Sequence, residues 1–429
     1  MSTPSTITSI SKLFAIAHHF ADQEGTALLY SGGDHDSAHT STLFLFPYEK
    51  ITLSAAPGCW NRLKKALGST PDAVGYLGYE MGCFADPDRE IPYLSPQTPD
   101  ALFYRSALII RFDHRTQKTT IIAQKDKIPK PYRSLDWIHD LKLPPIAPTS
   151  PLKQVYASDT PESYLDKITK IKELILDGEL YQVNLSQEFH FAGKTDPFAY
   201  FRQVTKINPA PFSAYLNCGE FTIVSSSPER FLKKENDQLE TRPIKGTSPR
   251  RANPKKDQAS RDYLQNSEKE RAELLMTTDL MRNDLSRVSR PKTVQTEALW
   301  QLETYTNVYH LLSIIKGRVE PHSHPIDILR AIFPGGSISG CPKLRAMEAI
   351  FEFEKRPRGI YTGSIGYFDG CGNFDFNIAI RTLVVYPNKV QIQLGGAIVI
   401  DSDPVREFEE TLHKGRSLFT ALGAEDLVI

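Results

Sequence analysis

Two pairs of glutamates in this chain have the spacing of a metal site. Glu270 and Glu273 lie in a segment with helical character, and Glu407 and Glu410 repeat the spacing near the C-terminus. Residues three apart on a helix share a face, so two such helices facing each other would crowd four carboxylates. That crowding requires a hard cation, for which Mg²⁺ is the natural candidate. Each pair taken alone is more typical of an acidic, solvent-facing helix surface.

A lysine on a constrained segment is the second candidate for chemistry. Lys245 follows Pro243-Ile244 and precedes Gly246-Thr247. An amine in an enclosed site can act as a nucleophile once burial or neighbouring charges lower its pKa. Taken alone, a lysine before Gly-Thr is more typical of a solvated turn.

The elements that must position these residues change in character after the first third of the chain. Proline-rich stretches at 128–131 and 143–151 interrupt any helix or strand, so we expect a connector there. Before it, the β-rich runs 41–46 and 107–112 predict strands.

After the connector, helices and strands mix. Thr160-Pro161 predicts a helix start, and the apolar spacing predicts that this helix runs until Gly178. A strand follows at 182–191, with apolar residues on one face. Its other face is polar and could line a site, through Gln182, Asn184, Ser186 and Glu188.

The composition is that of a large enzyme without a global charge. The chain has 429 residues, and 51 basic side chains balance 51 acidic ones. We therefore expect no nucleic acid and no membrane as partners, and a small substrate held by a local charge cluster. The five cysteines form no Cys-x-x-Cys pair, and neither a signal peptide nor a membrane-spanning run is evident, so we predict a cytoplasmic protein.

A series of motifs follows the connector in a fixed order. They occupy residues 177–186, 227–229, 242–250, 270–273, 279–288, 309–310, 333–343, 359–363, 378–382 and 395–402. In type and order these motifs resemble the chorismate-utilising enzymes. The first 150 residues resemble that family more loosely, through 28–32 and 75–79.

The resemblance implies an α+β fold of layered antiparallel β-sheets, sandwich-like and flanked by helices. It also implies an N-terminal region over residues 1–148 and a chorismate-binding catalytic region over residues 155–425, packed as one unit.

The family's metal ligands correspond to the paired glutamates. By resemblance, Glu273 and Glu410 would bind Mg²⁺ directly, and Glu270 and Glu407 would hold its waters. The metal would orient the ring carboxylate of chorismate and ease departure of the C4 oxygen.

The family's substrate contacts supply donors for the other carboxylate of chorismate. Arg381, expected on a strand, and Tyr361 would grip the enolpyruvyl carboxylate. Gly395 and Ala397 would add backbone N–H donors from a turn of small residues. Lys414, four residues after Glu410, could meet the same carboxylate. The implied substrate-binding residues are Gly246, Thr247, Tyr361, Arg381, Gly395, Ala397 and Lys414.

The implied catalytic residues are Lys245, Glu229 and His310. Glu229 would protonate the departing C4 hydroxyl, and Lys245 would attack C2. Ammonia arriving at C4 would then displace the lysine, while His310 would shape the site.

Two positions separate the branches of the family. Lys245 favours the branch that makes 4-amino-4-deoxychorismate for 4-aminobenzoate and folate synthesis, whereas the anthranilate branch has alanine there. Gln182 stands where isochorismate and salicylate synthases carry a lysine that activates water, and an amide cannot serve as that base.

The predicted function is therefore amination of chorismate at C4 by a transferase. The chain shows no Cys-His-Glu glutaminase signature, so we expect a separate glutamine amidotransferase subunit to deliver ammonia. The alternatives are the anthranilate-forming component I and a non-catalytic regulator that binds chorismate or tryptophan.

Overall fold

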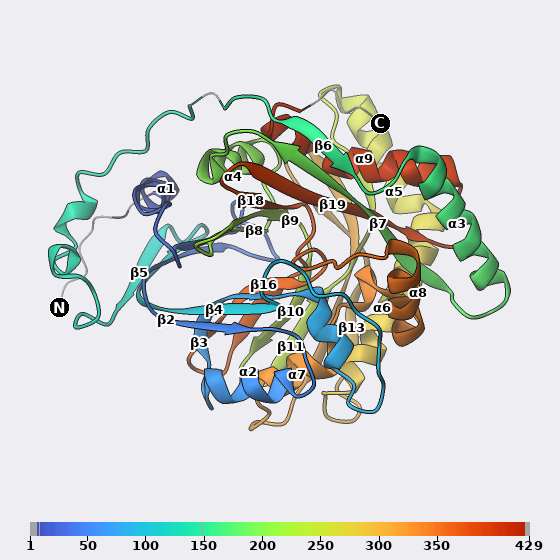
Figure 1. Cartoon of the computed structure of the whole chain (residues 1–429), viewed down its shortest axis with the longest axis horizontal. Coiled ribbons are helices and arrows are strands. Elements are labelled where there is room, and N and C mark those ends of the chain that lie inside the picture. The colour runs from blue at the N-terminus through green and yellow to red at the C-terminus, as the bar shows by residue number, and fades with distance from the viewer. Residues whose placement is uncertain (1–6, 8, 148, 425–429) are drawn as a thin grey trace.

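The chain folds into two layers of antiparallel β-sheet flanked by helices (Figure 1). The computed structural model describes residues 7, 9–147 and 149–424. Within that part of the chain, every strand pair is antiparallel, and the strands form one hydrogen-bonded series that folds back on itself. The predicted α+β class with layered antiparallel sheets is confirmed.

The upper layer in Figure 1 is centred on β7 and β19. β7 (Gln182–Ala192) pairs with β19 (Lys389–Ile398) on one edge, and with β6 (Lys153–Ala157) and β15 (Gly340–Cys341) on the other. From β19 the series runs through β18 (Thr382–Tyr386), β9 (Thr222–Ser227), β8 (Phe212–Asn217) and β1 (Ala27–Tyr30) to β2 (Thr40–Leu53).

The long strand β4 leads into the lower layer. β4 (Ala101–Asp113) pairs with β2 on one edge, and with β5 (Lys118–Ala123) and β3 (Asp72–Leu77) on the other. The series then passes through β16 (Ser364–Asp369), β17 (Phe374–Asn377), β10 (Arg230–Glu235) and β11 (Gln238–Arg242) to β14 (Val308–Arg318). β14 also pairs with β12 (Ile244–Pro249) and β13 (Gln295–Thr304).

Helices cover the outer faces of these layers (Figure 1). They are α1 (Ile10–His19), α2 (Cys59–Leu67), α3 (Pro161–Leu176), α4 (Pro197–Ile207), α5 (Pro254–Asn266), α6 (Glu268–Ser286), α7 (Pro325–Ile332), α8 (Lys343–Glu354) and α9 (Pro404–Ala421). Short 3₁₀ helices lie at Tyr79–Phe84, Lys130–Tyr132, Asp136–Ile138 and Gly336–Ile338. No helix in the described ranges is long and apolar enough to cross a membrane.

The elements predicted around the connector are confirmed. The Thr160 side chain accepts a hydrogen bond from the Ser163 N–H and caps α3, while Gly178, with φ of +79°, follows the helix end. The runs 41–46 and 107–112 lie within β2 and β4, and 182–191 lies within β7. The connector carries only short 3₁₀ turns within the described residues of 124–152.

The predicted N-terminal and catalytic regions share both sheets and cores. β1 pairs with β8 and β3 with β16, and one apolar cluster combines Phe20 and Leu108 with Phe191 and Phe419. The division into residues 1–148 and 155–425 stays a prediction, and its boundary residues 148 and 425 lie outside the described residues.

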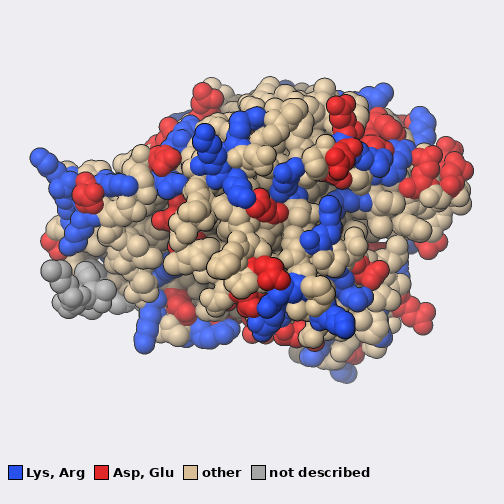
Figure 2. Space-filling view, turned by 90° about the horizontal axis from the view of Figure 1, so that it is seen from below, with Lys and Arg blue, Asp and Glu red and all other residues tan. Residues whose placement is uncertain are grey.

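The surface reflects the balanced composition. On the face shown in Figure 2, basic and acidic side chains are interspersed over the molecule. A binding site for an anionic substrate must therefore use a local arrangement of charges.

Candidate active site

Lys245 lies half-buried among charged side chains from α6, α9 and the turn between β9 and β10. It stands near the start of β12, opposite Leu311 on β14. Burial is the main cause that lowers the pKa of its amine, and the positive charge of Lys414 lowers this pKa further. The negative charges of Glu273, Glu229 and Glu410 act in the opposite direction. The structure thus brings together residues that are up to 185 positions apart in sequence.

Gly246 allows the chain to pass close to α6. It has φ of +75°, and the β12–β14 register shifts at this residue. A Cβ here would stand 2.8 Å from the Leu264 side chain and 2.9 Å from Glu270 Oε2. A larger residue would therefore disturb both the backbone conformation and one of the predicted metal ligands.

Glu229 is a buried carboxyl suited to donate a proton. It lies between β9 and β10, and Ser337 Oγ donates a hydrogen bond of 2.8 Å to its Oε1. Burial raises the pKa of Glu229 to about 7, although Ser337 and the Lys245 amine act in the opposite direction. The general-acid role predicted from the sequence is chemically feasible near neutral pH.

The four predicted metal ligands come from two helices and differ in exposure. Glu270 and Glu273 on α6 are partly buried, Glu407 on α9 is buried, and Glu410 is exposed. Burial is the main cause that raises the pKa values of Glu270 and Glu407. The negative charge of Glu273 raises the pKa of Glu270 further, and the negative charge of Glu410 raises the pKa of both Glu270 and Glu407. The two helices therefore do bring their carboxylates into one electrostatic neighbourhood.

The carboxylates do not form a ready coordination sphere. Among the described residues, no three His, Cys, Asp or Glu side chains are grouped closely enough to hold a metal ion. Glu410 Oε1 is instead 2.8 Å from Lys414 Nζ, and Glu407 Oε1 accepts a hydrogen bond from Ser402 Oγ. The all-carboxylate donor set suits Mg²⁺, but metal binding would have to replace the ion pair with Lys414.

His310 lies on β14 beside the segment that carries Lys245. Its Nδ1 is 2.8 Å from Thr247 Oγ1, and the edge-on ring of Tyr305 lies 5.2 Å away between centroids. Burial, with a further contribution from the positive charge of Arg381, lowers the pKa of His310 to about 3. The imidazole is therefore neutral at physiological pH.

Arg381 presents a guanidinium that is free to bind an anion. No hydrogen bond or ion pair joins its side chain to another residue in the described part of the chain. The prediction that it lies on a strand is wrong, since Arg381 occupies a bend just before β18 with φ of +51°. This left-handed conformation is uncommon for a non-glycine residue and is often found at functional sites.

The remaining predicted contacts meet on β19. A Cβ on Gly395 would stand 2.7 Å from Tyr361 Oη, and Lys414 Nζ donates to the Gly395 carbonyl at 3.2 Å. Gly395 and Ala397 lie within β19, opposite Ser186 and Asn184, so the predicted turn of small residues is wrong. Lys414 Nζ lies 2.8 Å from Glu410 Oε1 on the same helix, and its predicted contact with the substrate carboxylate stays a prediction.

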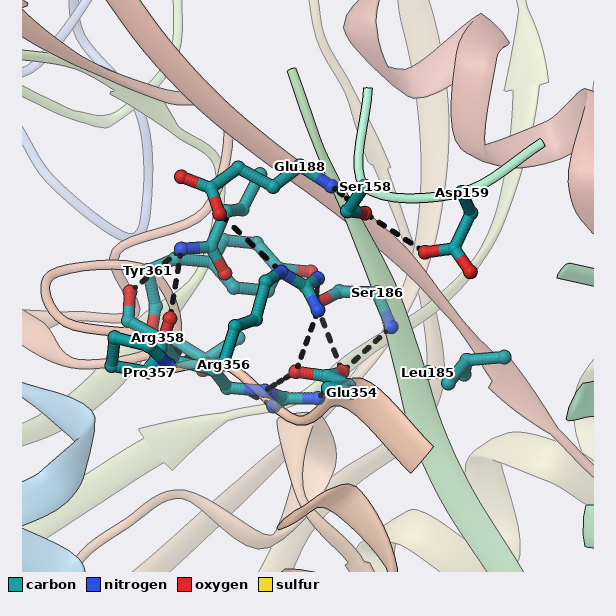
Figure 3. A network of polar contacts seen from close by, with 12 residues as sticks. Ser158, Asp159, Leu185, Ser186, Glu188, Glu354, Arg356, Pro357, Arg358 and Tyr361 are labelled. Carbon is teal, nitrogen blue, oxygen red and sulfur yellow. Dashed lines mark hydrogen bonds and ion pairs between the residues drawn. The ribbon is translucent and has the colours of Figure 1, made fainter. Parts of the chain in front are cut away.

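Sequence reasoning assigned no role to the polar network that supports Tyr361 (Figure 3). Glu354 Oε1 accepts hydrogen bonds from the Ser186 N–H at 2.8 Å and from Arg358 Nη2 at 2.7 Å. Arg358 Nη2 also donates to the Asn184 carbonyl. The network ties β7 to the loop that carries Tyr361, and the four-residue spacing of Glu354 and Arg358 was its only sequence signal.

Sequence reasoning also assigned no role to two polar side chains, Ser337 beside Glu229 and Asn184 beside Gly395. Ser337 is the hydrogen-bond donor to Glu229, and it lies in the motif 333–343 without having been assigned a role. Asn184 Oδ1 is buried without a hydrogen-bond partner and stands 2.9 Å from the position of a Cβ on Gly395. Its place on the polar face of the predicted strand was the available signal.

The fold and the arrangement of these residues are those of a chorismate-binding enzyme. The sequence profile of the chorismate binding enzymes matches residues 19–420, and the chain belongs to this family.

Particular relatives fall into two branches. The chain is 40% identical over 350 residues to aminodeoxychorismate synthase component 1 of Klebsiella aerogenes, covering 80% of this chain and 75% of that protein. It is 34% identical over 371 residues to anthranilate synthase component 1 of Streptomyces coelicolor, covering 81% and 72%. The crystal structure of anthranilate synthase component I from Streptococcus pneumoniae superposes with a TM-score of 0.77 at 29% identity, covering 90% of this chain and 93% of that one. The expected family and fold are therefore confirmed.

Proposed function

We propose that this protein is the component I of an aminodeoxychorismate synthase. It would convert chorismate and ammonia into 4-amino-4-deoxychorismate for 4-aminobenzoate and folate synthesis. The observation that carries the proposal is Lys245, an amine with a lowered pKa placed near the buried acid Glu229. Identity to relatives of that name supports the same branch.

The first half of the reaction joins lysine to substrate. The neutral amine of Lys245 forms a bond to C2 of chorismate, both ring double bonds shift by one position, and the C4–O bond breaks. Glu229 donates its proton to the departing C4 oxygen, which leaves as water. The amine loses one proton as it becomes a secondary amine bound to the ring.

The second half reverses the shift of the double bonds. Ammonia forms a bond to C4, both ring double bonds return to their original positions, and the C2–N bond to Lys245 breaks. The proton lost from the incoming ammonia compensates for the one that the lysine nitrogen regains. The net reaction replaces the C4 hydroxyl with an amino group and releases one water.

Substrate orientation would use the convergent donors of the site. Arg381 and Tyr361 would bind the enolpyruvyl carboxylate, with the backbone of Gly395 and Ala397 beside them. Gly246, Thr247 and Lys414 would line the remaining contact surface. Neutral His310, held by Thr247, would accept or donate a hydrogen bond to a ring substituent without adding a charge.

Mg²⁺ would be held by Glu270, Glu273, Glu407 and Glu410. It would neutralise these carboxylates and supply a positive centre for the ring carboxylate of chorismate.

A separate glutamine amidotransferase would supply ammonia, and the cytoplasm would be the compartment. The names of relatives as component 1 support a partner subunit. All five cysteines are free thiols, as is usual in a reducing compartment.

Anthranilate synthase component I remains the second candidate, because relatives of that name are 34–37% identical to the chain. The direct test supplies the purified chain with chorismate, Mg²⁺ and ammonium, and identifies the product by mass. The proposal predicts 4-amino-4-deoxychorismate, which gives 4-aminobenzoate only after an aminodeoxychorismate lyase is added. Anthranilate formed without a lyase would favour the second candidate. Absence of any chemistry, with chorismate still bound, would favour a non-catalytic regulator.

A further inference from the structure

A small polar hollow lies beside Tyr361, on the polar face shared by β7, β18 and β19. Its volume is about 200 Å³. We call it the β18–β19 hollow. Its lining includes Glu188, His190, Tyr361, Val384, Tyr386, Gln391 and Gln393.

The β18–β19 hollow is smaller than the usual pocket for an organic ligand. Pockets for ordinary organic ligands have volumes of roughly 300–1,000 Å³. A water molecule takes about 30 Å³ of liquid, so the hollow suits a ligand of a few atoms with some water.

Two hydrogen-bonding atoms of the lining have no partner in the described residues. Gln393 Nε2 donates to the Arg358 carbonyl at 3.0 Å, and this bond fixes the orientation of the amide. Gln393 Oε1 is therefore the free end, and it is buried without a hydrogen bond. Tyr386 Oη is also buried and unpartnered. The Gln393 oxygen requires a donor from a ligand or from water, and the Tyr386 hydroxyl can accept or donate a hydrogen bond.

A carboxylate adds negative charge to the same lining. Glu188 Oε1 is 2.8 Å from His190 Nε2, and Oε2 is 3.5 Å from Arg356 Nε. The Glu188 side chain is only 13% exposed. Figure 3 shows the contact between Glu188 and Arg356 as a dashed line.

The neighbouring cations are only partly matched by carboxylates. Arg358 pairs with Glu354 at 2.7 Å, whereas Arg356 lies 3.7 Å from Glu354 and 3.5 Å from Glu188, and its Nε and Nη1 are buried without a hydrogen-bond partner in the described residues. Arg356 is not among the residues that line the hollow. The unpartnered lining atoms, Gln393 Oε1 and Tyr386 Oη, can both accept a hydrogen bond from a small donor with positive charge. Ammonium has that size, that charge and four N–H donors.

We propose that the β18–β19 hollow binds ammonium and holds it one side chain away from chorismate. Tyr361 lines the hollow, and its hydroxyl also abuts Gly395, where the substrate carboxylate is expected. This inference rests on the proposed function, because only an aminating enzyme needs ammonia at this place.

The first test detects the ligand without turnover. Thallous ion has the charge and approximate size of ammonium and scatters X-rays anomalously. Crystals of the full chain soaked in thallous acetate should show an anomalous peak in the hollow, which excess ammonium displaces. A hollow without a peak would overturn the proposal.

The second test asks whether the hollow serves the reaction. Val384→Phe fills the hollow, and Val155→Phe on exposed β6 is the matched control. We expect Val384→Phe to raise KM for ammonium at least fivefold while KM for chorismate changes less than twofold. Glu188→Gln, checked for an unchanged Tm, should raise KM for ammonium in the same way without filling the space.

The outcomes distinguish failure of the ammonium-site proposal from failure of the proposed function. Unchanged KM for ammonium in both Val384→Phe and Glu188→Gln would overturn a role for the hollow in ammonia supply. If the wild type made no aminated product from ammonium, the proposed function would fail. The thallous peak alone would then decide whether the hollow is a cation site.

Discussion

The carboxyl of Glu229 and the amine of Lys245 lie close enough for each to shift the pKa of the other. Burial raises the pKa of Glu229 to about 7 and lowers that of Lys245. These are the directions that a proton donor and an amine nucleophile need at neutral pH. One enclosed environment therefore prepares both groups.

The first prediction concerns the pH dependence of this pair. Glu229 must be protonated to act, so kcat/KM for chorismate should fall as pH rises through about 7. Lys245 must be neutral, so the same parameter should fall at low pH, below the lowered pKa of the amine. The profile is measured at a constant concentration of free ammonia.

Glu229→Gln tests the role of the proton donor separately. Loss of the proton donor should reduce kcat by about 10²–10⁴-fold and remove the decline above pH 7. Glu220→Gln, an exposed control nearby in sequence, should leave the profile unchanged. A Glu229→Gln enzyme that kept both its rate and its alkaline decline would exclude Glu229 as the acid.

The second prediction concerns the metal ligands. Glu273→Gln and Glu410→Gln should abolish turnover, because each removes a charged ligand from a site with few others. Mg²⁺ titrations of activity, with Tm as the check on folding, measure the effect. Glu409→Gln, next to Glu410 on the same helix, is the control and should behave as wild type. Near-wild-type activity of either ligand variant at limiting Mg²⁺ would show that the metal assignment is wrong.

The third prediction concerns Arg381, whose guanidinium has no partner in the described residues. Arg381→Lys keeps the charge but loses the two-pronged geometry that matches a carboxylate. The lost charged hydrogen bond is worth about 1.5–3 kcal/mol, which corresponds to a rise of roughly 10–150-fold in the Kd of chorismate. Calorimetric titration checks this value, and an unchanged Kd would place the carboxylate elsewhere.

The fourth prediction concerns nitrogen supply. The isolated chain should use ammonium but not glutamine, because no glutaminase signature is present. Adding a glutamine amidotransferase subunit should restore glutamine use, as measured by product formation. Glutamine-dependent product from the pure single chain would contradict this division of labour.

Much of the fold could be predicted from sequence because local signals set it. The Thr160 cap and Gly178 delimit α3, and the alternation in 182–191 identifies β7. Arg381 was misplaced because its left-handed bend follows from packing around β18, which no local pattern records. Gly395 and Ala397 suggested a turn, yet ten residues of pairing with β7 hold them in a strand.

The site was predictable only as far as family motifs reached. Lys245 and Glu229 were assigned by resemblance, and their pKa shifts depend on burial that appears only in the fold. Ser337 and the Glu354–Arg358 pair were missed because their roles depend on long-range contacts with Glu229 and Ser186. Such contacts join segments more than 100 residues apart and leave no local periodicity.

The central claim is that Lys245 forms a bond to the substrate. The most direct test incubates the protein with chorismate and Mg²⁺ without ammonia, quenches it, and measures the mass of the peptide containing Lys245. We predict an added mass of chorismate less one water on that peptide in the wild type, and none in Lys245→Ala. The variant should still bind chorismate, but its amination should slow or shift to attack at C2, giving aminodeoxyisochorismate or anthranilate. An unmodified wild-type peptide, together with an unchanged rate and product in Lys245→Ala, would contradict the covalent route.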